Sequence, residues 1–177
     1  RRQRQMCIRD SGDVGGDQRS SADENAEEAR QAEQDNALPR DGFYTDPADP
    51  GEPGTVVRSE PFEGWESLGE EPHTSRMVYR SLSAEGDPVV SSAALAVPEG
   101  DAPDEGWPVV AWAHGNSGVA PHCAPSLMKD LYYGDMIHEI VAQGYAVVAT
   151  DYAGLGAGEG HEFYSVPAHG NLSLIHI

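Results

Sequence analysis

The sequence predicts an α/β fold, and the prediction depends on two short apolar runs with a helix-like segment between them. Residues 107–113 form an apolar run that is too short for a helix and ends at the polar turn of residues 114–118. Residues 144–151 repeat the pattern. Apolar runs of this length, bounded by Gly and Pro, are typical of buried strands. Strand, helix and strand in this order form a βαβ unit, and ligands gather where its strands end.

The helix between the two runs is best defined at its C-terminal end. Gly144 stands where a left-handed cap residue belongs. An apolar stripe at helical spacing precedes it and predicts one buried helix face. The stripe consists of Met136, Ile137, Ile140 and Val141.

Upstream of the βαβ unit, the pattern predicts an extended segment, a strand and a hairpin. Residues 41–54 are rich in Pro and Gly and should run extended over the surface. Residues 55–60 predict a short first strand. Residues 77–82 and 89–97 are two further strands, which a polar turn joins into a hairpin.

Residues 12–40 form an acidic segment that is rich in Gly, Ser, Gln, Asp and Glu and holds almost no large apolar residue. Such a composition cannot bury enough apolar surface to offset the entropy of ordering, so we predict disorder. Residues 24–34 could at most form a transient polar helix, because no apolar stripe would hold them to a core.

The charge of the chain excludes one class of partner. The formal net charge is −19, from 11 basic and 30 acidic residues. Such a surface repels nucleic acid and anionic membranes, so we expect no nucleic-acid partner. No stretch of the sequence has the ~18 consecutive apolar residues of a transmembrane span. Nothing in the sequence predicts the oligomeric state.

Several segments, taken in order, resemble the secretory lipases of the α/β-hydrolase superfamily, a group of lipase A-like enzymes with actinobacterial relatives. The resemblance covers roughly residues 41–170 and rests on the order and spacing of the segments rather than on any one of them. They are residues 42–44, 51–55, 58–61, 107–118 and 144–156, and the run Cys123-Ala124-Pro125-Ser126-Leu127.

The resemblance implies a serine esterase or lipase of lipid catabolism that cleaves a small-molecule ester or lipid through an acyl-enzyme, without cofactor or metal. It implies an incomplete α/β-hydrolase fold, with the N-terminal strands of a mostly parallel sheet and its first helix. The nucleophile, acid and histidine of the triad would lie beyond this chain, which alone is expected to be inactive. A secreted or cell-envelope anchored protein is expected.

Both ends of the chain resemble translated sequencing-adaptor sequence. The organisation we expect is therefore an adaptor-like artefact over residues 1–11 and a disordered acidic segment over residues 12–40. The N-terminal part of the hydrolase domain would follow over residues 41–171, and a second adaptor-like artefact over residues 172–177. A signal peptide or lipid anchor would precede the chain.

The candidate catalytic element is the turn of His114, Gly115, Asn116 and Ser117. In the resembling enzymes, a turn at this place directs a backbone N–H at the oxyanion that develops on the substrate. Glycine at position 115 lets the chain turn without a Cβ clash. The donor would be the N–H of Asn116 or Ser117, with Ser117 slightly favoured. An ordinary strand-to-loop turn is the alternative.

Ser117 could instead be the nucleophile. The sequence around it nearly fits G-x-S-x-G, but Val119 stands where the last glycine belongs. A nucleophile elbow also runs straight into a helix, whereas Pro121 and Pro125 follow here. The oxyanion turn is therefore favoured.

Other polar residues suggest further sites, which the spacing does not favour. In the superfamily, the triad acid follows the nucleophile, so Asp151 is more consistent with a structural carboxylate that accepts loop amides. A dinucleotide loop at residues 154–160 fails, because Glu159 and His161 stand where the third glycine belongs. No recognised zinc spacing relates the remaining candidates. These are His114, His122, Cys123, His138 and His161.

Cysteine usage bears on the cellular compartment. Cys7 lies in the adaptor-like segment, which leaves Cys123 alone. The resemblance implies that Cys123 forms a disulfide with a residue beyond the chain, as a secreted protein would permit. A free thiol is the alternative.

Two other functions stay open. The first is a peptidase of the same fold, and the second is a non-catalytic cell-envelope binding module with a hydrolase-like fold. A Gly-x-Ser-x-Gly motif downstream of Asn171 would distinguish an enzyme from a binding module.

Overall fold

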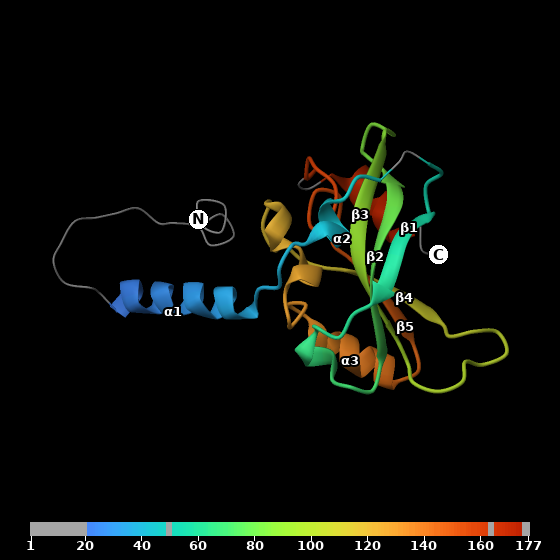
Figure 1. The fold of residues 1–177 in the computed structure, drawn as a ribbon, viewed down its shortest axis with the longest axis horizontal. Helices are drawn as coiled ribbons and strands as arrows, with labels where there is room; N and C mark the ends of the chain where they lie inside the picture. The colour runs from blue at the N-terminus through green and yellow to red at the C-terminus, as the bar shows by residue number, and fades with distance from the viewer. Residues whose placement is uncertain (1–20, 49–50, 163–164, 175–177) are drawn as a thin grey trace.

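A computed structural model describes residues 21–48, 51–162 and 165–174, and it centres on one five-stranded sheet (Figure 1). The strand order is β1-β2-β3-β5-β4. The strands are β1 (Val56–Pro61), β2 (His73–Leu82), β3 (Pro88–Val97), β4 (Val109–Ala113) and β5 (Ala146–Thr150). The helices are α1 (Ser21–Asn36), α2 (Gly42–Thr45), α3 (Gly134–Ala142) and α4 (Val166–Leu174), and the 3-10 turns are η2 (Glu66–Leu68), η3 (Pro121–Cys123) and η4 (Pro125–Leu127).

Strand pairing confirms the predicted hairpin and the predicted βαβ unit. β1, β2, β3 and β5 pair antiparallel in turn, and β4 pairs parallel with β5. Among the described strands, only β4 and β5 are therefore parallel to each other. β1 to β3 form an antiparallel meander, to which β5 adds antiparallel. Ala113 stands opposite Thr150. The residues that follow these two strands therefore lie together at the carboxyl end of the strands.

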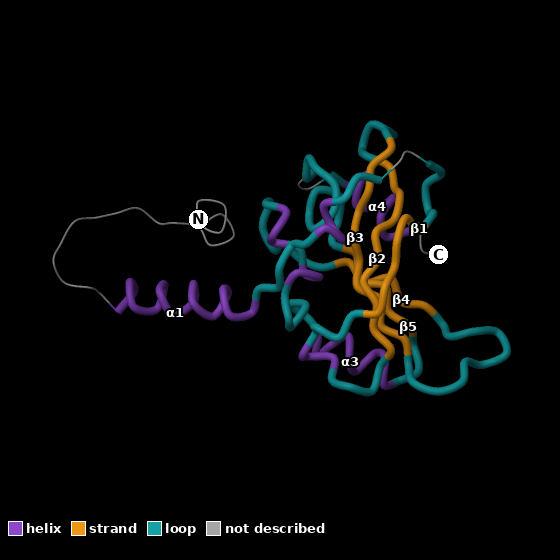
Figure 2. The backbone as a smooth tube through the Cα atoms, viewed as in Figure 1, coloured by secondary structure: helices purple, strands orange, loops and turns teal. Residues whose placement is uncertain are grey.

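Each face of the sheet carries its own apolar cluster. Side chains alternate along β5, so Val148 lies in one cluster and Val147 in the other. All five residues of β5, which lies between β3 and β4, are buried. α3 and η2 cover one face of the sheet, and α2, η3, η4 and α4 contribute to the other. Figure 2 shows α3 beside one end of the strands.

The predicted helix is α3, and its C-terminal cap is as expected. Gly144 adopts φ 89° and its N–H donates to the carbonyl of Val141 at 2.9 Å. The apolar stripe is narrower than predicted. Ile137 and Val141 are buried, whereas Met136 is 55 % exposed because it lies beside the buried face rather than on it.

The N-terminal acidic segment differs in part from the predicted disorder. Residues 12–20 lie outside the described residues, but residues 21–36 form α1. Its composition of Ala, Glu, Gln and Arg explains the helix, since these residues have high helix propensity. α1 projects away from the sheet (Figure 1).

Contacts hold α1 to the domain at its C-terminal end. The Tyr132 hydroxyl donates to a carboxylate oxygen of Glu33 at 2.6 Å, and the Asn36 amide donates to the carboxylate of Asp130 at 2.8 Å. The N–H of Leu38 donates to the carbonyl of Leu127 at 2.7 Å. The end of the predicted disordered segment is therefore bound to the domain.

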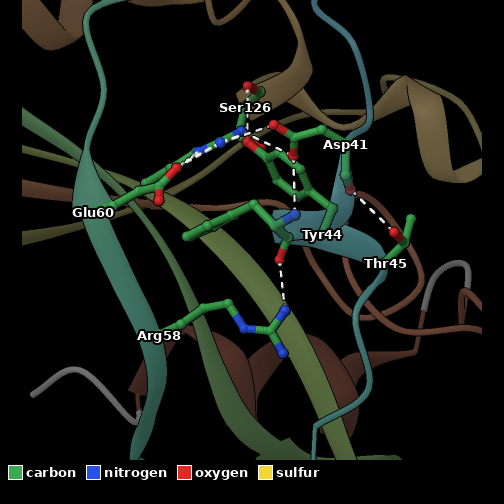
Figure 3. A network of polar contacts seen from close by, with 8 residues as sticks. Asp41, Tyr44, Thr45, Arg58, Glu60 and Ser126 are labelled. Atoms are coloured by element: carbon green, nitrogen blue, oxygen red, sulfur yellow. Dashed lines mark hydrogen bonds and ion pairs between the residues drawn. The ribbon is translucent and has the colours of Figure 1, made fainter.

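A buried arginine fixes the segment between α1 and β1. Arg76 of β2 is 8 % exposed, and its guanidinium donates to Asp41 at 2.9 and 3.2 Å and to Glu60 at 2.6 and 2.8 Å (Figure 3). It also lies 4.3 Å from the ring centroid of Phe43. The Asp41 carboxylate accepts the N–H of Phe43 as an N-cap. α2 therefore interrupts the extended path that was predicted over residues 41–54, of which 49–50 lie outside the described residues.

The C-terminal helix of the described fold, α4, extends past the expected boundary at Asn171. Leu172 is fully buried in the core, and α4 contacts β2 and β4. The predicted boundary after Asn171 therefore falls inside a helix. The adaptor-like origin of residues 1–11 and 172–177 stays a prediction.

In the described part of the chain, no helix has both the length and the apolar character to cross a membrane.

Candidate active site

His114 begins the candidate turn and links the ends of two strands. Its side chain is 7 % exposed. Nδ1 lies 2.5 Å from the carbonyl oxygen of Gly115, and Nε2 lies 3.3 Å from that of Asp151. Burial lowers the pKa of His114, although the two carbonyls favour the charged form. The ring of His114 therefore lies between the segments that follow β4 and β5, and in its neutral form it can donate to one of the two carbonyls.

Gly115 follows, and a close approach explains why it is a glycine. A Cβ atom placed there would lie 2.9 Å from the hydroxyl of Tyr133. Tyr133 is thus the group that a larger residue at position 115 would meet.

The oxyanion role predicted for this turn requires a backbone N–H that no protein acceptor occupies. The N–H groups of the turn differ in this respect. The N–H of Gly118 donates to the side-chain oxygen of Asn116 at 3.0 Å. The N–H groups of Asn116 and Ser117 donate to no acceptor within residues 21–48, 51–162 and 165–174. They are therefore available to an external acceptor, whereas that of Gly118 is engaged. Both donors that the sequence left open remain candidates.

The side chain of Ser117 is unusual in its environment. Its hydroxyl oxygen is buried and has no hydrogen-bond partner among the described residues. A buried hydroxyl normally has a partner. In particular, no described histidine or carboxylate accepts a hydrogen bond from it.

Tyr152 lies behind the turn, and sequence reasoning did not single it out. Its hydroxyl donates to the carbonyl of His114 at 2.9 Å. The ring centroid of Tyr152 lies 4.4 Å from that of His114 and 4.3 Å from that of His169, which stacks nearly parallel to it at 9°. His169 comes from α4. Burial lowers the pKa of His169, and nearby His161 lowers it further.

The turn and these rings enclose a cleft of about 150 Å³. It contains all four predicted catalytic residues. His161, whose Nδ1 lies 3.0 Å from the carbonyl oxygen of Ala153, also reaches it. The lining residues are His114, Gly115, Asn116, Ser117, Gly118, Tyr152, Leu155, His161 and His169.

Asp151 has the structural position that was predicted for it. It is fully buried, and its carboxylate accepts hydrogen bonds from the backbone N–H of Ser126 at 2.8 Å and from the hydroxyls of Ser126 and Ser92. Burial raises the pKa of Asp151 to about 6, although the hydrogen bonds from Ser126 and Ser92 oppose the shift. Because the carboxylate is enclosed, it holds segments together rather than facing the cleft.

The metal-site alternative gains no support from the geometry of its candidate ligands. The described residues contain no group of three or more His, Cys, Asp or Glu side chains arranged to hold a metal ion. His138 lies on α3, where its Nδ1 is 3.0 Å from the carbonyl oxygen of Leu68.

Cys123 lies in the core with no exposed surface and is not a free thiol. The other cysteine of the sequence, Cys7, lies outside the described residues. The pairing of Cys123 with a residue beyond the chain therefore stays a prediction.

No protein-family model matches the sequence, and no curated protein matches it. Among solved structures, the rice cell wall degrading esterase LipA from Xanthomonas oryzae is similar, with 20 % identity and a TM-score of 0.54 over 71 % of this chain and 36 % of the esterase. Lipase A from Candida antarctica in its closed state is similar with 24 % identity and a TM-score of 0.52, over 66 % of this chain and 30 % of the lipase. The chain thus spans about a third of the length of these proteins. It has part of the α/β-hydrolase fold that the sequence predicts, but the described sheet is mixed rather than mostly parallel, because only β4 and β5 pair parallel.

Proposed function

We propose that this chain is the N-terminal part of a serine hydrolase, an esterase or lipase that cleaves carboxylic esters. The turn after β4 supplies a backbone N–H donor to the oxyanion. One observation carries the proposal: the N–H groups of Asn116 and Ser117 have no acceptor among the described residues and border a cleft at the carboxyl edge of the sheet. Ligands bind at this edge in α/β proteins.

The chemistry of ester cleavage explains why such a donor matters. Attack of a serine oxygen on the ester carbonyl moves negative charge onto the carbonyl oxygen. A preorganised N–H in a water-poor cleft stabilises that charge without having to reorient. Removal of one such donor costs about 10²–10³ in turnover.

Ser117 is better placed as a donor than as the nucleophile. A serine nucleophile needs a base within hydrogen-bond reach. The Ser117 hydroxyl has no hydrogen bond to any described residue, histidines included. The triad therefore belongs to the further length that the similar esterase and lipase have, in a protein that is secreted or anchored at the cell envelope.

The test uses the full-length gene product, with Ser117→Pro and Ser117→Ala as a matched pair. The alanine variant keeps the N–H and should retain most of its p-nitrophenyl ester turnover. The proline variant lacks the N–H and should lose about 10²–10³ in kcat if Ser117 is the donor. Val119→Pro controls for the rigidity of proline, and Asn116→Pro tests the other candidate donor.

Fluorophosphonate labelling distinguishes the remaining functions. Loss of labelling in folded Ser117→Ala would make Ser117 the nucleophile and refute the donor role. A full-length protein that neither hydrolyses esters nor takes up the label would be a binding module. Cleavage of peptides rather than esters would identify a peptidase of the same fold.

A further inference from the structure

Tyr152 has a backbone conformation that few residues other than glycine adopt. It follows β5 by two positions, and its φ is 65°. Bulky side chains rarely occupy the left-handed region, because Cβ then crowds the backbone. A strained backbone conformation persists only where the surrounding structure holds it, and such conformations cluster at functional sites.

The conformation is held from the core side of the sheet. The N–H of Tyr152 donates to the side-chain oxygen of Thr150 at 3.3 Å. The hydroxyls of Thr150 and Tyr79 are hydrogen-bonded to each other at 2.6 Å, and Tyr79 is 1 % exposed. A buried chain of contacts therefore leads from β2 through the end of β5 to Tyr152.

The side chain of Tyr152 contacts the turn in two ways. Its ring packs between His114 and His169, and its hydroxyl donates to the carbonyl of His114. That carbonyl belongs to the peptide bond that leads into Gly115. Orientation of this peptide therefore sets the direction in which the turn leaves β4, and with it the direction of the amides at Asn116 and Ser117.

We propose that Tyr152 is the positioning residue of the oxyanion turn. It fixes the His114 carbonyl so that the amides at Asn116 and Ser117 stay directed at the cleft. The inference rests on the proposed function but adds a role that the predicted turn alone does not contain. Because the hydroxyl is already bonded to His114, Tyr152 acts through the turn and not on the substrate.

The experiment compares Tyr152→Phe with Tyr145→Phe in the full-length protein. Tyr152→Phe removes one hydroxyl and leaves the ring and the backbone preference unchanged. Tyr145→Phe makes the same change at a position that is 41 % exposed, before β5. We expect kcat of Tyr152→Phe to fall about five- to tenfold, which corresponds to one hydrogen bond. KM should change less than about twofold, because the donor acts in the transition state, and Tyr145→Phe should match the wild type.

A second readout follows the turn itself. Amide hydrogen exchange of residues 115–118 should accelerate in Tyr152→Phe, while exchange in β5 stays the same.

If Tyr152→Phe does not fold, Tyr152→Asn tests the same point, since Asn tolerates the left-handed region but does not reach His114. A folded Tyr152 variant with wild-type kcat would overturn the inference, as would a kcat loss that the melting temperature fully accounts for. If Ser117→Pro and Asn116→Pro both retain full activity, the proposed function fails first; if either loses activity and Tyr152→Phe does not, only this inference fails.

Discussion

Asp151 joins three segments that are far apart in the sequence. Through its carboxylate it holds Ser92 of β3 and Ser126 of η4 to the end of β5. A buried charge is costly unless it is well hydrogen-bonded, and here burial outweighs its hydrogen bonds and raises the pKa of Asp151 to about 6. The same carboxylate therefore holds these segments together and makes stability depend on pH.

The sign of that dependence follows from the direction of the shift. In the unfolded chain Asp151 titrates near 3.9, so the folded state binds its proton more tightly. The stabilisation that the proton provides is complete below about pH 4 and is lost as the pH rises through about 6. We expect the unfolding free energy of the wild type, relative to Asp151→Asn, to increase as the pH falls from 7 to 5. Urea denaturation of the full-length protein at several pH values measures it.

His114 provides a control of opposite sign. Its folded-state pKa is lowered by burial, so the neutral form is favoured and stability is lost as the pH falls below about 6.5. His114→Gln should therefore gain stability relative to the wild type over the range in which Asp151→Asn loses it. Parallel curves for the wild type and Asp151→Asn would show that the carboxylate stays ionised in both states.

α1 shows how an element can form without a core. Its described residues lie on the surface, and an isolated helix of this length is marginal in water. The contacts at Glu33 and Asn36 hold its last turn. The acidic residues of the first turn, Asp23 and Glu24, complement the helix dipole.

Hydrogen exchange tests this division within one helix. The amides of residues 24–30 should exchange at rates near those of an unfolded peptide, because the described contacts with the domain begin at Glu33. The N–H of Leu38, bonded to Leu127 at 2.7 Å, should be protected. Tyr132→Phe removes the hydroxyl that holds Glu33 and should extend the fast-exchanging region toward Asn36. Uniform protection from residue 24 onward would contradict this division.

Local patterns predicted the elements well where one residue determines them. Gly144 ends α3 through its own φ. The short apolar runs at β4 and β5 indicate strands by their length and composition alone. Positions that depend on distant partners escaped prediction. Arg76 of β2 forms an ion pair with Asp41, which lies 35 positions earlier at the start of α2, and no local pattern indicates that pairing.

The same difference explains the candidate site. The turn after β4 is visible in the sequence, because a strand end and a glycine are adjacent there, and its oxyanion role is what the resemblance implies. Tyr152 and His169 were not, because their roles depend on a positive φ and on where α4 packs. The closeness of Tyr133 to Gly115 likewise becomes visible only in three dimensions.

The sheet as a whole has two edges of different character. β1 carries Arg58, Glu60 and Pro61 and has an irregular register near Val56, and these features discourage pairing with another chain. β4 has no charged residue and no proline, and Val109 is 55 % exposed. Within the described sheet, β4 is thus the edge that invites a further strand.

We therefore expect residues 12–174, which keep α4 whole, to self-associate through β4 when expressed alone and to show no ester hydrolysis above buffer. Val109→Lys should increase the monomer fraction in sedimentation, because a charge on an edge opposes strand pairing. Val56→Lys is the matched control, since Val56 is also 55 % exposed but lies on the protected edge. A sharply melting monomer would place the domain boundary elsewhere. Turnover that depends on Ser117 would place the nucleophile within this chain.

The strand order also constrains how the chain folds as it leaves the ribosome. β1, β2 and β3 can pair as they emerge, but β4 has no partner among them, because β5 lies between β3 and β4. The apolar strand Val109–Ala113 must therefore wait, exposed, until Thr150 has cleared the exit tunnel. At about 5–20 residues per second, translation leaves this strand unpaired for seconds. Translation speed and chaperone capture over that interval thus determine how much of the nascent protein reaches the sheet.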